Sequence, residues 1–388
     1  MKIAANGITL HAEESGTGDL ALVFLHYWGG SARTWAPLMA ALKADLRAIA
    51  LDARGWGQSD RPADGYDIAT MADDVASAID ALGLERYVLI GHSMGGKVAQ
   101  LLASRRPSGL CGLVLVAPSP AQGKALGTEE RAAMKGAYAN SDAVRWTIDN
   151  VLAHRALAPP LLDQVIADSM GGAPTAKSAW PGFAISEDVS AGLSRIAVPV
   201  LVIGGEMDKV DSVDMLRSVV LPALPHATLS IVADAGHLLP FEAPRELAER
   251  ILAFIDQEVS GLRRAPLHPE DIPAAFDAAL NRGDLNALMA LFHPGATMRM
   301  TDGSIIVEEP AALREALSAL LALRPSLRNI VRRVLVSGDV ALLLLDWEIR
   351  IAPPGEAERV ERGTATQVAE RSADRTWLLR IANPLGIN

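Results

Sequence analysis

Short apolar runs alternate with helix-like segments along most of the chain, from residue 3 to residue 255. Five of these runs have the length of a strand and few polar residues, as strands covered on both faces of a parallel sheet require: ALVFLH, RAIALD, YVLIGHS, GLVLVAP and PVLVIGG. Residues 34–43, 71–82 and 94–105, which lie between the runs, have the pattern of helices. The alternation predicts an α/β domain built on a mostly parallel sheet.

The alternation stops between residues 119 and 196, where no comparable strand run occurs. Helix-like segments carry the bulky apolar residues there, so we expect a helical cap inserted over the sheet. Most of these side chains are expected to form the core of the cap itself. Tyr138, Trp146 and Trp180 are its candidates for contact with a substrate.

A second change of character, near residue 258, marks a domain boundary. The stretch EVSGLRRAPLHPEDIP combines glycine, prolines and mixed charges, which is typical of a linker. Beyond it, helical segments precede the strand-like runs RNIVRRVLV, VALLLLDWEIRI, RGTATQVAER and RTWLLRIA. A chain of 388 residues is longer than a single core usually grows. We therefore expect an α/β domain over residues 1–258, a linker over 259–269 and an α+β domain over 270–388.

Composition excludes several classes of function. The formal net charge of −10 argues against nucleic acid as a partner. Cys111 is the only cysteine, so neither an intramolecular disulfide nor a cysteine-based metal cluster can form, and no other metal-ligand spacing is present. The N-terminal segment MKIAANGITLHAEESG has no apolar core of signal-peptide length, and no stretch of about 18 uninterrupted apolar residues is present to span a membrane. We expect a cytoplasmic protein that acts on a small molecule and needs neither a metal nor a cofactor.

The segment LIGHSMGGKVAQ, residues 89–100, fits two incompatible motifs. Its glycines and Lys97 nearly spell a phosphate-binding P-loop, but Val98 occupies the position where that motif needs a Ser or Thr for its magnesium ion. The letters GHSMG spell the G-x-S-x-G turn that presents a nucleophilic serine between a strand and a helix. The missing magnesium ligand favours the second interpretation, with Ser93 as the nucleophile.

A serine hydroxyl is a weak nucleophile unless a base takes its proton and a carboxylate orients that base. On the fold of this motif the acid and then the histidine follow the serine, each in a loop after a late strand. PVLVIGGEMDKV provides Asp208 and LSIVADAGHLLPFEAP provides His237. Glu206 lies closer to the end of its strand and has less loop to carry it to the histidine. Asp211 and Asp234 remain as alternative acids.

The oxyanion that forms during acyl transfer needs two preorganised N–H donors. Met94, which directly follows the predicted nucleophile, supplies one of them. The other is expected from the loop HYWGGS after the run ALVFLH, with Trp28 as the donor. His26 and His92 flank the site and are expected to serve packing or hydrogen bonding.

These segments together resemble the α/β-hydrolase superfamily over residues 1 to about 258. HYWGGSARTW, LDARGWGQSD, GHSMGG, GGEMD and GHLLPFEAP match its recurring segments in order. The resemblance implies an α/β-hydrolase fold, a mostly parallel sheet with a helical cap. Tyr27 departs from the glycine that usually follows His26, which implies either a differently shaped oxyanion loop or a phenol in the substrate pocket. Serine at position 93 distinguishes the chain from the haloalkane dehalogenases and epoxide hydrolases of this fold, which have aspartate there.

Residues from about 270 to 388 resemble the SnoaL-like, nuclear transport factor 2-like superfamily, which implies a cone-like α+β domain with a curved sheet. This segment contains no tyrosine, so the tyrosine donor of the isomerases in that superfamily is absent. Asp302, Asp346 and Glu348 are possible pocket carboxylates, with a solvated surface carboxylate as the alternative for each. One face of such a sheet often packs against a second copy, so we expect a homodimer formed through residues 270–388.

The leading hypothesis is a cofactor-free serine hydrolase that cleaves an ester, thioester or lactone of a small molecule through an acyl-enzyme. Ser93 attacks, His237 carries the proton and Asp208 holds the imidazole. A carbon–carbon bond hydrolase or a cofactor-free haloperoxidase would use the same three residues. The hypothesis of another class is a ligand-binding or dimerising scaffold with a vestigial hydrolase domain, and the complete set of catalytic residue types argues against it.

Overall fold

The computed structural model describes residues 1–42, 46–196, 198–224, 226–259, 266, 268–300, 302–351, 359–372 and 376–386. These residues form two compact units, Met1–Asp256 and Gln257–Asn388. Most of the predicted linker, residues 259–269, lies outside the described residues. Within the described ranges, no helix has both the length and the apolar character needed to cross a lipid bilayer.

The first unit is built on an eight-stranded sheet in the order β1-β2-β4-β3-β5-β6-β7-β8. The strands from β3 to β8 run parallel, and β1 and β2 add an antiparallel hairpin at one edge. The strands are β1 (Lys2–Ala5), β2 (Ile8–Ser15), β3 (Ala21–Leu25), β4 (Arg47–Leu51), β5 (Tyr87–His92), β6 (Leu110–Val116), β7 (Val200–Gly205) and β8 (Ala227–Val232). The predicted mostly parallel sheet is confirmed, since each apolar run named above forms a strand.

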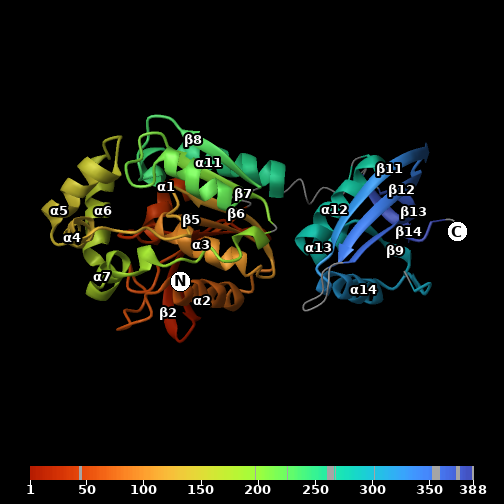
Figure 1. Ribbon diagram of the computed structural model, residues 1–388, viewed down its shortest axis with the longest axis horizontal. Coiled ribbons are helices and arrows are strands. Elements are labelled where there is room, and N and C mark those ends of the chain that lie inside the picture. Colours follow the sequence, from red (N-terminus) through yellow and green to blue (C-terminus); the bar gives the residue numbers. More distant parts are fainter. Residues whose placement is uncertain are drawn as a thin grey trace. The chain divides into compact units, whose positions relative to one another are not determined.

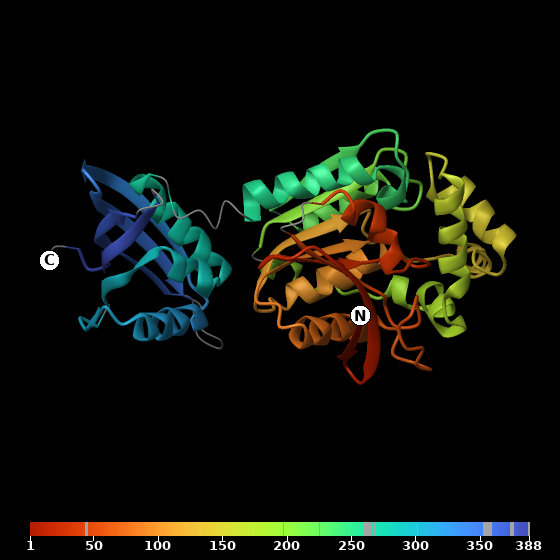
Figure 2. The ribbon, with the colours of Figure 1, turned by 180° about the vertical axis from the view of Figure 1, so that it is seen from behind.

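Strands β3, β5 and β7 are buried along their whole length, which explains why the sequence shows continuous apolar runs there. Figures 1 and 2 show α1 (Ala36–Met39) and α11 (Pro244–Phe254) on one face of the sheet, with α2 (Ile68–Ala81) and α3 (Met94–Ser104) on the other. Because the strands are parallel, the loops that follow β3, β5, β7 and β8 all leave the same edge of the sheet. A site built from these loops can therefore draw on distant parts of the chain.

Between β6 and β7 the chain forms helices and turns and no strand, over residues 117–196. Figure 1 shows helices α4 to α7 of this cap gathered at one end of the first unit. Prolines begin α6 and α7, where the missing N–H has no partner to lose. The cap elements are α4 (Thr128–Gly136), α5 (Ser141–Thr147), η2 (Ile148–Leu152), α6 (Pro159–Gly171), α7 (Pro174–Gly182), η3 (Ala184–Ser186) and η4 (Leu193–Arg195).

Short helices complete the first unit between and after these elements. They are η1 (Ala32–Trp35), α8 (Val213–Met215), η5 (Leu216–Val220), α9 (Leu221–Ala223) and α10 (Leu239–Glu242). The helix η6 (Ile255–Val259) begins in the first unit and ends in the second.

The second unit has a six-stranded sheet in the order β10-β9-β14-β13-β12-β11, antiparallel except for the pair of β14 and β9. Alternate residues of β12, such as Leu343 and Leu345, are buried against the helices, which lie on one side of the sheet (Figure 1). The elements are η7 (Pro269–Asp271), α12 (Ile272–Arg282), α13 (Leu285–Ala290), β9 (Phe292–Arg299), β10 (Ile305–Val307), α14 (Pro310–Ala322), β11 (Ser326–Ser337), β12 (Val340–Ile351), β13 (Arg359–Arg371) and β14 (Trp377–Asn383). The predicted α+β class is confirmed.

One detail of this unit differs from the sequence-based expectation. The strands β9 and β10 lie between α13 and α14, so the helices do not all precede the sheet. β9 contains Pro294 and Gly295, which are uncommon inside strands, and its pairing partner β14 lies far along the chain.

Candidate active site

Ser93 lies at a sharp turn between β5 and α3. Its φ of 51° and ψ of −108° are uncommon for a residue other than glycine. A Cβ on Gly91 would lie 2.4 Å from the carbonyl oxygen of Gly95, and a Cβ on Gly95 would lie 2.5 Å from that of Leu25. Both glycines of G-x-S-x-G are therefore required by the close approach of strand, turn and helix. The turn holds Ser93 where the parallel strands end.

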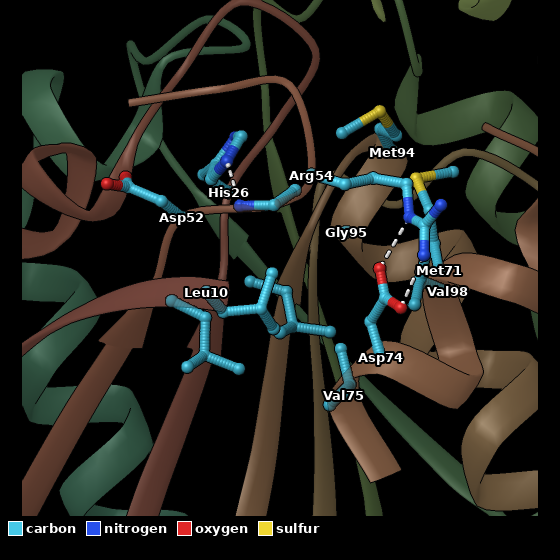
Figure 3. Close-up of a pocket in the computed structure, with 13 residues that line it drawn as sticks. Leu10, His26, Asp52, Arg54, Met71, Asp74, Val75, Met94, Gly95 and Val98 are labelled. Carbon is cyan, nitrogen blue, oxygen red and sulfur yellow. Dashed lines mark hydrogen bonds and ion pairs between the residues drawn. The ribbon is translucent and has the colours of Figure 1, made fainter. Parts of the chain in front are cut away.

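A cavity of about 30 Å³ borders the start of α3 (Figure 3). Met94 and Gly95 line it from α3, and a buried ion pair closes it, with Arg54 Nε and Nη2 each 2.6 Å from the carboxylate oxygens of Asp74. Such a volume holds one or two water molecules. The cavity is therefore too small for a substrate.

His237 and Asp208 are paired in the loops that follow β8 and β7. The Nδ1 of His237 lies 2.8 Å from Oδ2 of Asp208, and both side chains are buried. The other oxygen of Asp208 accepts the backbone N–H groups of Val210 at 2.7 Å and Asp211 at 3.0 Å. The imidazole is therefore held through Nδ1, and its Nε2 forms no hydrogen bond with a described residue.

The same contacts shift both pKa values. Burial alone would lower the pKa of His237, but the neighbouring carboxylates of Asp208 and Asp211 outweigh it and hold that pKa above its usual value. Burial alone would raise the pKa of Asp208, but His237 and the two backbone N–H donors hold it below its usual range. A charged carboxylate beside a histidine of raised basicity is the arrangement that a general base requires.

His92 connects the end of β5 to the loop that carries His237. The Nε2–H of His92, the residue before Ser93, donates to the backbone carbonyl of His237 at 2.8 Å. The two rings lie 5.1 Å apart between centroids. Burial holds the pKa of His92 well below its usual value, so this ring stays neutral. His92 therefore joins the two loops by packing and hydrogen bonding, the kind of role expected from the sequence.

The other candidate acids lie elsewhere or have other partners. Asp211 is buried next to Asp208 and accepts a hydrogen bond from Lys124. Asp234 is exposed and pairs with His154 at 3.0 Å. Glu206 accepts the backbone N–H of Asp234 at 3.1 Å. Among the candidates, only Asp208 contacts the imidazole of His237.

Glu242 organises the loop of His237, a role that the sequence analysis missed. Its buried carboxylate accepts the N–H groups of Gly236 at 2.9 Å, Leu238 at 3.0 Å and His154 at 2.8 Å. Gly236 and Leu238 flank His237, whereas His154 belongs to the cap, so Glu242 connects the loop of His237 to the cap. An acidic residue inside the mostly apolar segment GHLLPFEAP was the available signal, because a buried carboxylate needs such partners.

The two backbone N–H groups expected to donate to the oxyanion form no hydrogen bond with a described residue. The N–H of Trp28 forms no hydrogen bond with a described residue, and Met94, as the first residue of α3, has no partner for its N–H within the helix. His26 sets the peptide unit that carries the first donor: its Nδ1–H donates to the carbonyl of Tyr27 at 2.7 Å, while its Nε2 accepts the N–H of Ala53 at 3.0 Å. The sequence analysis gave His26 only a general structural role.

The four predicted substrate-contact residues occupy different environments. Tyr27 is buried and packs on His92 with 5.1 Å between ring centroids. Tyr138 and Trp180 are buried in the cap, whereas Trp146 is 62% exposed on α5. Contact of any of them with a substrate remains a prediction.

Lys97 does not face a phosphate site. Its side chain is fully buried, and its Nζ donates to the carbonyl of Ile185 in the cap at 2.9 Å. Burial lowers the pKa of Lys97 to about 8. The ammonium group of Lys97 therefore connects α3 to the cap, and it loses its hydration shell because it is buried there.

We expect replacement of Lys97 by Met to stabilise the protein at pH 7 by about 1–3 kcal/mol. Below pH 8 the lysine is charged in both folded and unfolded chains, so the folded state carries the full cost of burying the charge. Between pH 8 and the usual lysine pKa the unfolded chain binds more protons, and this cost disappears. Urea unfolding should show the gap at pH 7 and its decrease by roughly pH 10.

The carbonyl of Ile185 keeps a second donor, the N–H of Lys124 at 2.9 Å, so the Lys97→Met variant does not leave it unpaired. Lys135→Met, at an exposed position of α4, is the control and should change stability little at either pH. A Lys97→Met protein less stable than the natural chain at pH 7 would show that the hydrogen bond outweighs the cost of burial.

The candidate carboxylates of the second unit lie at its surface. Asp302 is exposed and accepts from Ser304. Asp346 pairs with Arg332 at 2.6 Å, and Glu348 pairs with Arg362 at 2.8 Å. In the described ranges, no group of three or more His, Cys, Asp or Glu residues is arranged so that it could hold a metal ion.

A family model described as the alpha/beta hydrolase fold matches residues 21–244, more than half of the chain. The chain belongs to the α/β-hydrolase family. A second model, described as a SnoaL-like domain, matches residues 274–375, so this α/β hydrolase carries a SnoaL-like domain. Both resemblances stated from the sequence are confirmed.

Comparisons with individual proteins agree with the assignment to the α/β-hydrolase family. The AB hydrolase superfamily protein YisY of Bacillus subtilis (strain 168) is 30% identical over 257 residues, 64% of this chain and 95% of the relative. The 2-(acetamidomethylene)succinate hydrolase of Mesorhizobium japonicum is 28% identical over 267 residues, 64% of this chain and 92% of the relative. A thermophilic esterase from Thermogutta terrifontis has a TM-score of 0.60 at 25% identity, covering 67% of this chain and 98% of its own. With the family model, these similarities identify the chain as a hydrolase.

Proposed function

We propose that this α/β hydrolase is a cofactor-free serine hydrolase that cleaves an ester, thioester or lactone of a small molecule through an acyl-enzyme. The observation that carries the proposal is the pairing of His237 with Asp208 at 2.8 Å. The loops of these two residues leave the same edge of the sheet as the turn that holds Ser93 at a φ of 51°. The similarity to a solved esterase supports it.

In the proposed mechanism the hydroxyl of Ser93 attacks the carbonyl carbon while its proton passes to Nε2 of His237. The resulting imidazolium is stabilised by the carboxylate of Asp208, which also fixes the ring through Nδ1. The N–H groups of Trp28 and Met94 donate to the oxyanion. When the tetrahedral intermediate collapses, His237 returns the proton to the leaving oxygen or sulfur, and the acyl group stays on Ser93.

A water molecule then repeats the sequence on the acyl-enzyme. His237 takes a proton from the water, the hydroxide attacks the acyl carbon, and the proton returns to the oxygen of Ser93 as the acid leaves. No step of this scheme needs a metal or cofactor.

A panel of nitrophenyl esters from acetyl to dodecanoyl, with matched thioesters and lactones, tests the substrate class. We expect hydrolysis of at least one member, with kcat/KM varying with acyl length, because Ser93 is only 7% exposed and the acyl group has to fit the space around it. Natural protein that hydrolyses no ester, thioester or lactone while remaining folded would contradict the proposal.

We expect kcat/KM to rise with pH, with a midpoint above the value of about 6.5 that is usual for histidine. The base must be neutral to accept the proton of Ser93, and the raised pKa of His237 means that the imidazole loses its own proton only at higher pH. Activity should therefore be lost as pH falls through that midpoint. The rate of labelling by a fluorophosphonate should follow the same midpoint, and a flat profile between roughly pH 5 and 9 would contradict the assignment of the base.

We also propose that the protein is a homodimer formed through its SnoaL-like domain. On the face of the sheet opposite its helices, the directly paired residues Leu335, Leu342, Val368 and Ile381 form an apolar stripe across β11, β12, β13 and β14. Leu335 is 53% exposed and Ile381 is 43% exposed. A second copy would cover this stripe and remove its apolar surface from water.

Light scattering should then show a dimer for the natural chain and a monomer for Leu335→Lys, since burial of an unpaired charge opposes association. Ile305→Lys, at a position 61% exposed on β10, is the matched control and should leave the dimer intact. A monomeric natural chain at micromolar concentration would refute the interface.

A further inference from the structure

Three consecutive carbonyl groups of the expected oxyanion loop are each held by a donor. The carbonyl of Tyr27 accepts from His26 and from the N–H of Gly30, both within the loop. The next two carbonyls accept from the cap: Trp28 from the hydroxyl of Tyr138 at 2.7 Å, and Gly29 from the hydroxyl of Ser169 at 2.9 Å. Tyr138 lies between α4 and α5, and Ser169 lies on α6, more than a hundred residues along the chain from the loop they hold.

Tyr138 contacts the loop with its ring as well as its hydroxyl. Its ring packs on that of Trp28 with centroids 4.1 Å apart and an interplanar angle of 31°. A Cβ on Gly29 would lie 2.4 Å from the phenol oxygen, and Gly29 has a φ of 100°, so only glycine fits there. Burial raises the pKa of Tyr138, so the phenol keeps its proton and acts as a donor.

The cap makes a further tie to the residues that follow. Asp168, next to Ser169 on α6, accepts from the hydroxyl of Ser31 at 2.9 Å and pairs with Arg33. The loop is therefore tied to α6 at three residues, Gly29, Ser31 and Arg33.

Because peptide units are planar, these hydrogen bonds to carbonyl groups also affect the orientation of the expected oxyanion donor, the N–H of Trp28. The N–H of Trp28 shares a planar peptide unit with the carbonyl of Tyr27 and points the opposite way, so His26 sets its direction. The following unit, which carries the carbonyl of Trp28, is set by Tyr138. The two backbone dihedrals of Trp28 are fixed when the peptide units before and after it are both hydrogen-bonded. The hydrogen bond to the second unit comes from Tyr138 in the cap.

We propose that Tyr138 and Ser169 are positioning residues for the oxyanion hole, so that the seated cap improves the stabilisation of an oxyanion at the hydrolase site. The proposal rests on the proposed serine hydrolase function. It assigns Tyr138 to the oxyanion loop in place of the substrate contact expected from the sequence. Through these two hydroxyls, a substrate that moves the cap would also change the catalytic geometry.

Tyr138→Phe and Ser169→Ala each remove one hydroxyl, and Tyr138→Phe keeps the ring that packs on Trp28. Each should lower kcat on a model ester by about 10- to 100-fold, less than the loss of an oxyanion donor itself, while KM changes less than about threefold. A trifluoromethyl ketone, whose adduct with the serine carries an oxyanion, should lose affinity by the same factor as kcat/KM. A role limited to folding would not produce this parallel loss.

Two controls remove equivalent hydrogen bonds elsewhere. Tyr66→Phe removes a buried phenol that donates to the carbonyl of Pro62 at 2.7 Å, and Thr147→Val removes a cap hydroxyl that donates to the carbonyl of Ala143 at 2.8 Å. Both should retain kcat and trifluoromethyl ketone affinity within about threefold. Hydrogen exchange of the peptide that contains residues 27–30 provides a readout that needs no activity, and it should accelerate in Tyr138→Phe and Ser169→Ala alone.

The two proposals fail in different ways. A natural protein that neither hydrolyses esters nor binds the trifluoromethyl ketone would refute the serine hydrolase mechanism, while faster exchange in the two cap variants would still support the hold on the loop. If the natural protein is active and Tyr138→Phe and Ser169→Ala match the two controls in kcat, inhibitor affinity and exchange, the positioning role is refuted.

Discussion

Ser93→Ala should lower the hydrolysis of a model ester by about three to six orders of magnitude while the protein stays folded. The substitution removes the only nucleophile in the proposed scheme, whereas the oxyanion donors and the cap remain and can support a residual rate above that of water alone. The strained turn depends on Gly91 and Gly95, not on the serine hydroxyl, so unfolding by urea should change little. Steady-state kinetics on freshly purified protein give the comparison.

Ser104→Ala is the matched control for this loss. Ser104 is a buried serine on the same helix, α3, and its hydroxyl donates to the carbonyl of Leu101 at 2.8 Å, away from the site. Its activity should remain within about threefold of the natural protein. An active Ser93→Ala protein would show that another group attacks the substrate.

Asp208→Asn should lower kcat by about three to four orders of magnitude, close to the effect of His237→Ala. An amide can neither balance the charge of the imidazolium nor require the tautomer that leaves Nε2 free to accept a proton. The carboxylate also accepts the N–H groups of Val210 and Asp211, so the variant has to be checked for its folded state by circular dichroism. The double variant Ser93→Ala with Asp208→Asn should be little worse than Ser93→Ala alone, because the residues act as one unit.

Asp234→Asn is the control for charge in the same region. Asp234 is exposed and pairs with His154, and it does not contact His237. Its replacement should leave kcat nearly unchanged. If Asp234→Asn or Asp211→Asn removes activity and Asp208→Asn does not, the acid has been assigned to the wrong residue.

Features that depend on local sequence could be predicted for this chain. The buried strands β3, β5 and β7 appear as apolar runs because both their faces are covered. The turn at Ser93 could be predicted from the sequence because its two glycines are required by contacts within a few residues and with the adjacent strand. His237 and Asp208 could be chosen because the order of strands decides which loops meet at one edge of the sheet.

Features that depend on distant contacts could not be predicted. Nothing near Tyr138 in the sequence indicates that its hydroxyl meets the carbonyl of Trp28, 110 positions away. The exposure of Trp146 could not be predicted either, because the helical pattern around it does not show which side of α5 faces the core. The hairpin of β1 and β2 and the strand β9 were missed because their residues are only partly buried or include proline and glycine.

The central claim is that Ser93 is the one activated serine of the chain, and covalent labelling tests it directly. A fluorophosphonate should add once per chain, and peptide mass spectrometry should place the adduct on Ser93, with labelling abolished in Ser93→Ala and strongly slowed in His237→Ala and Asp208→Asn. Labelling should persist in Ser104→Ala and Asp234→Asn. No adduct on the folded natural protein, or an adduct on a residue other than Ser93, would contradict the account.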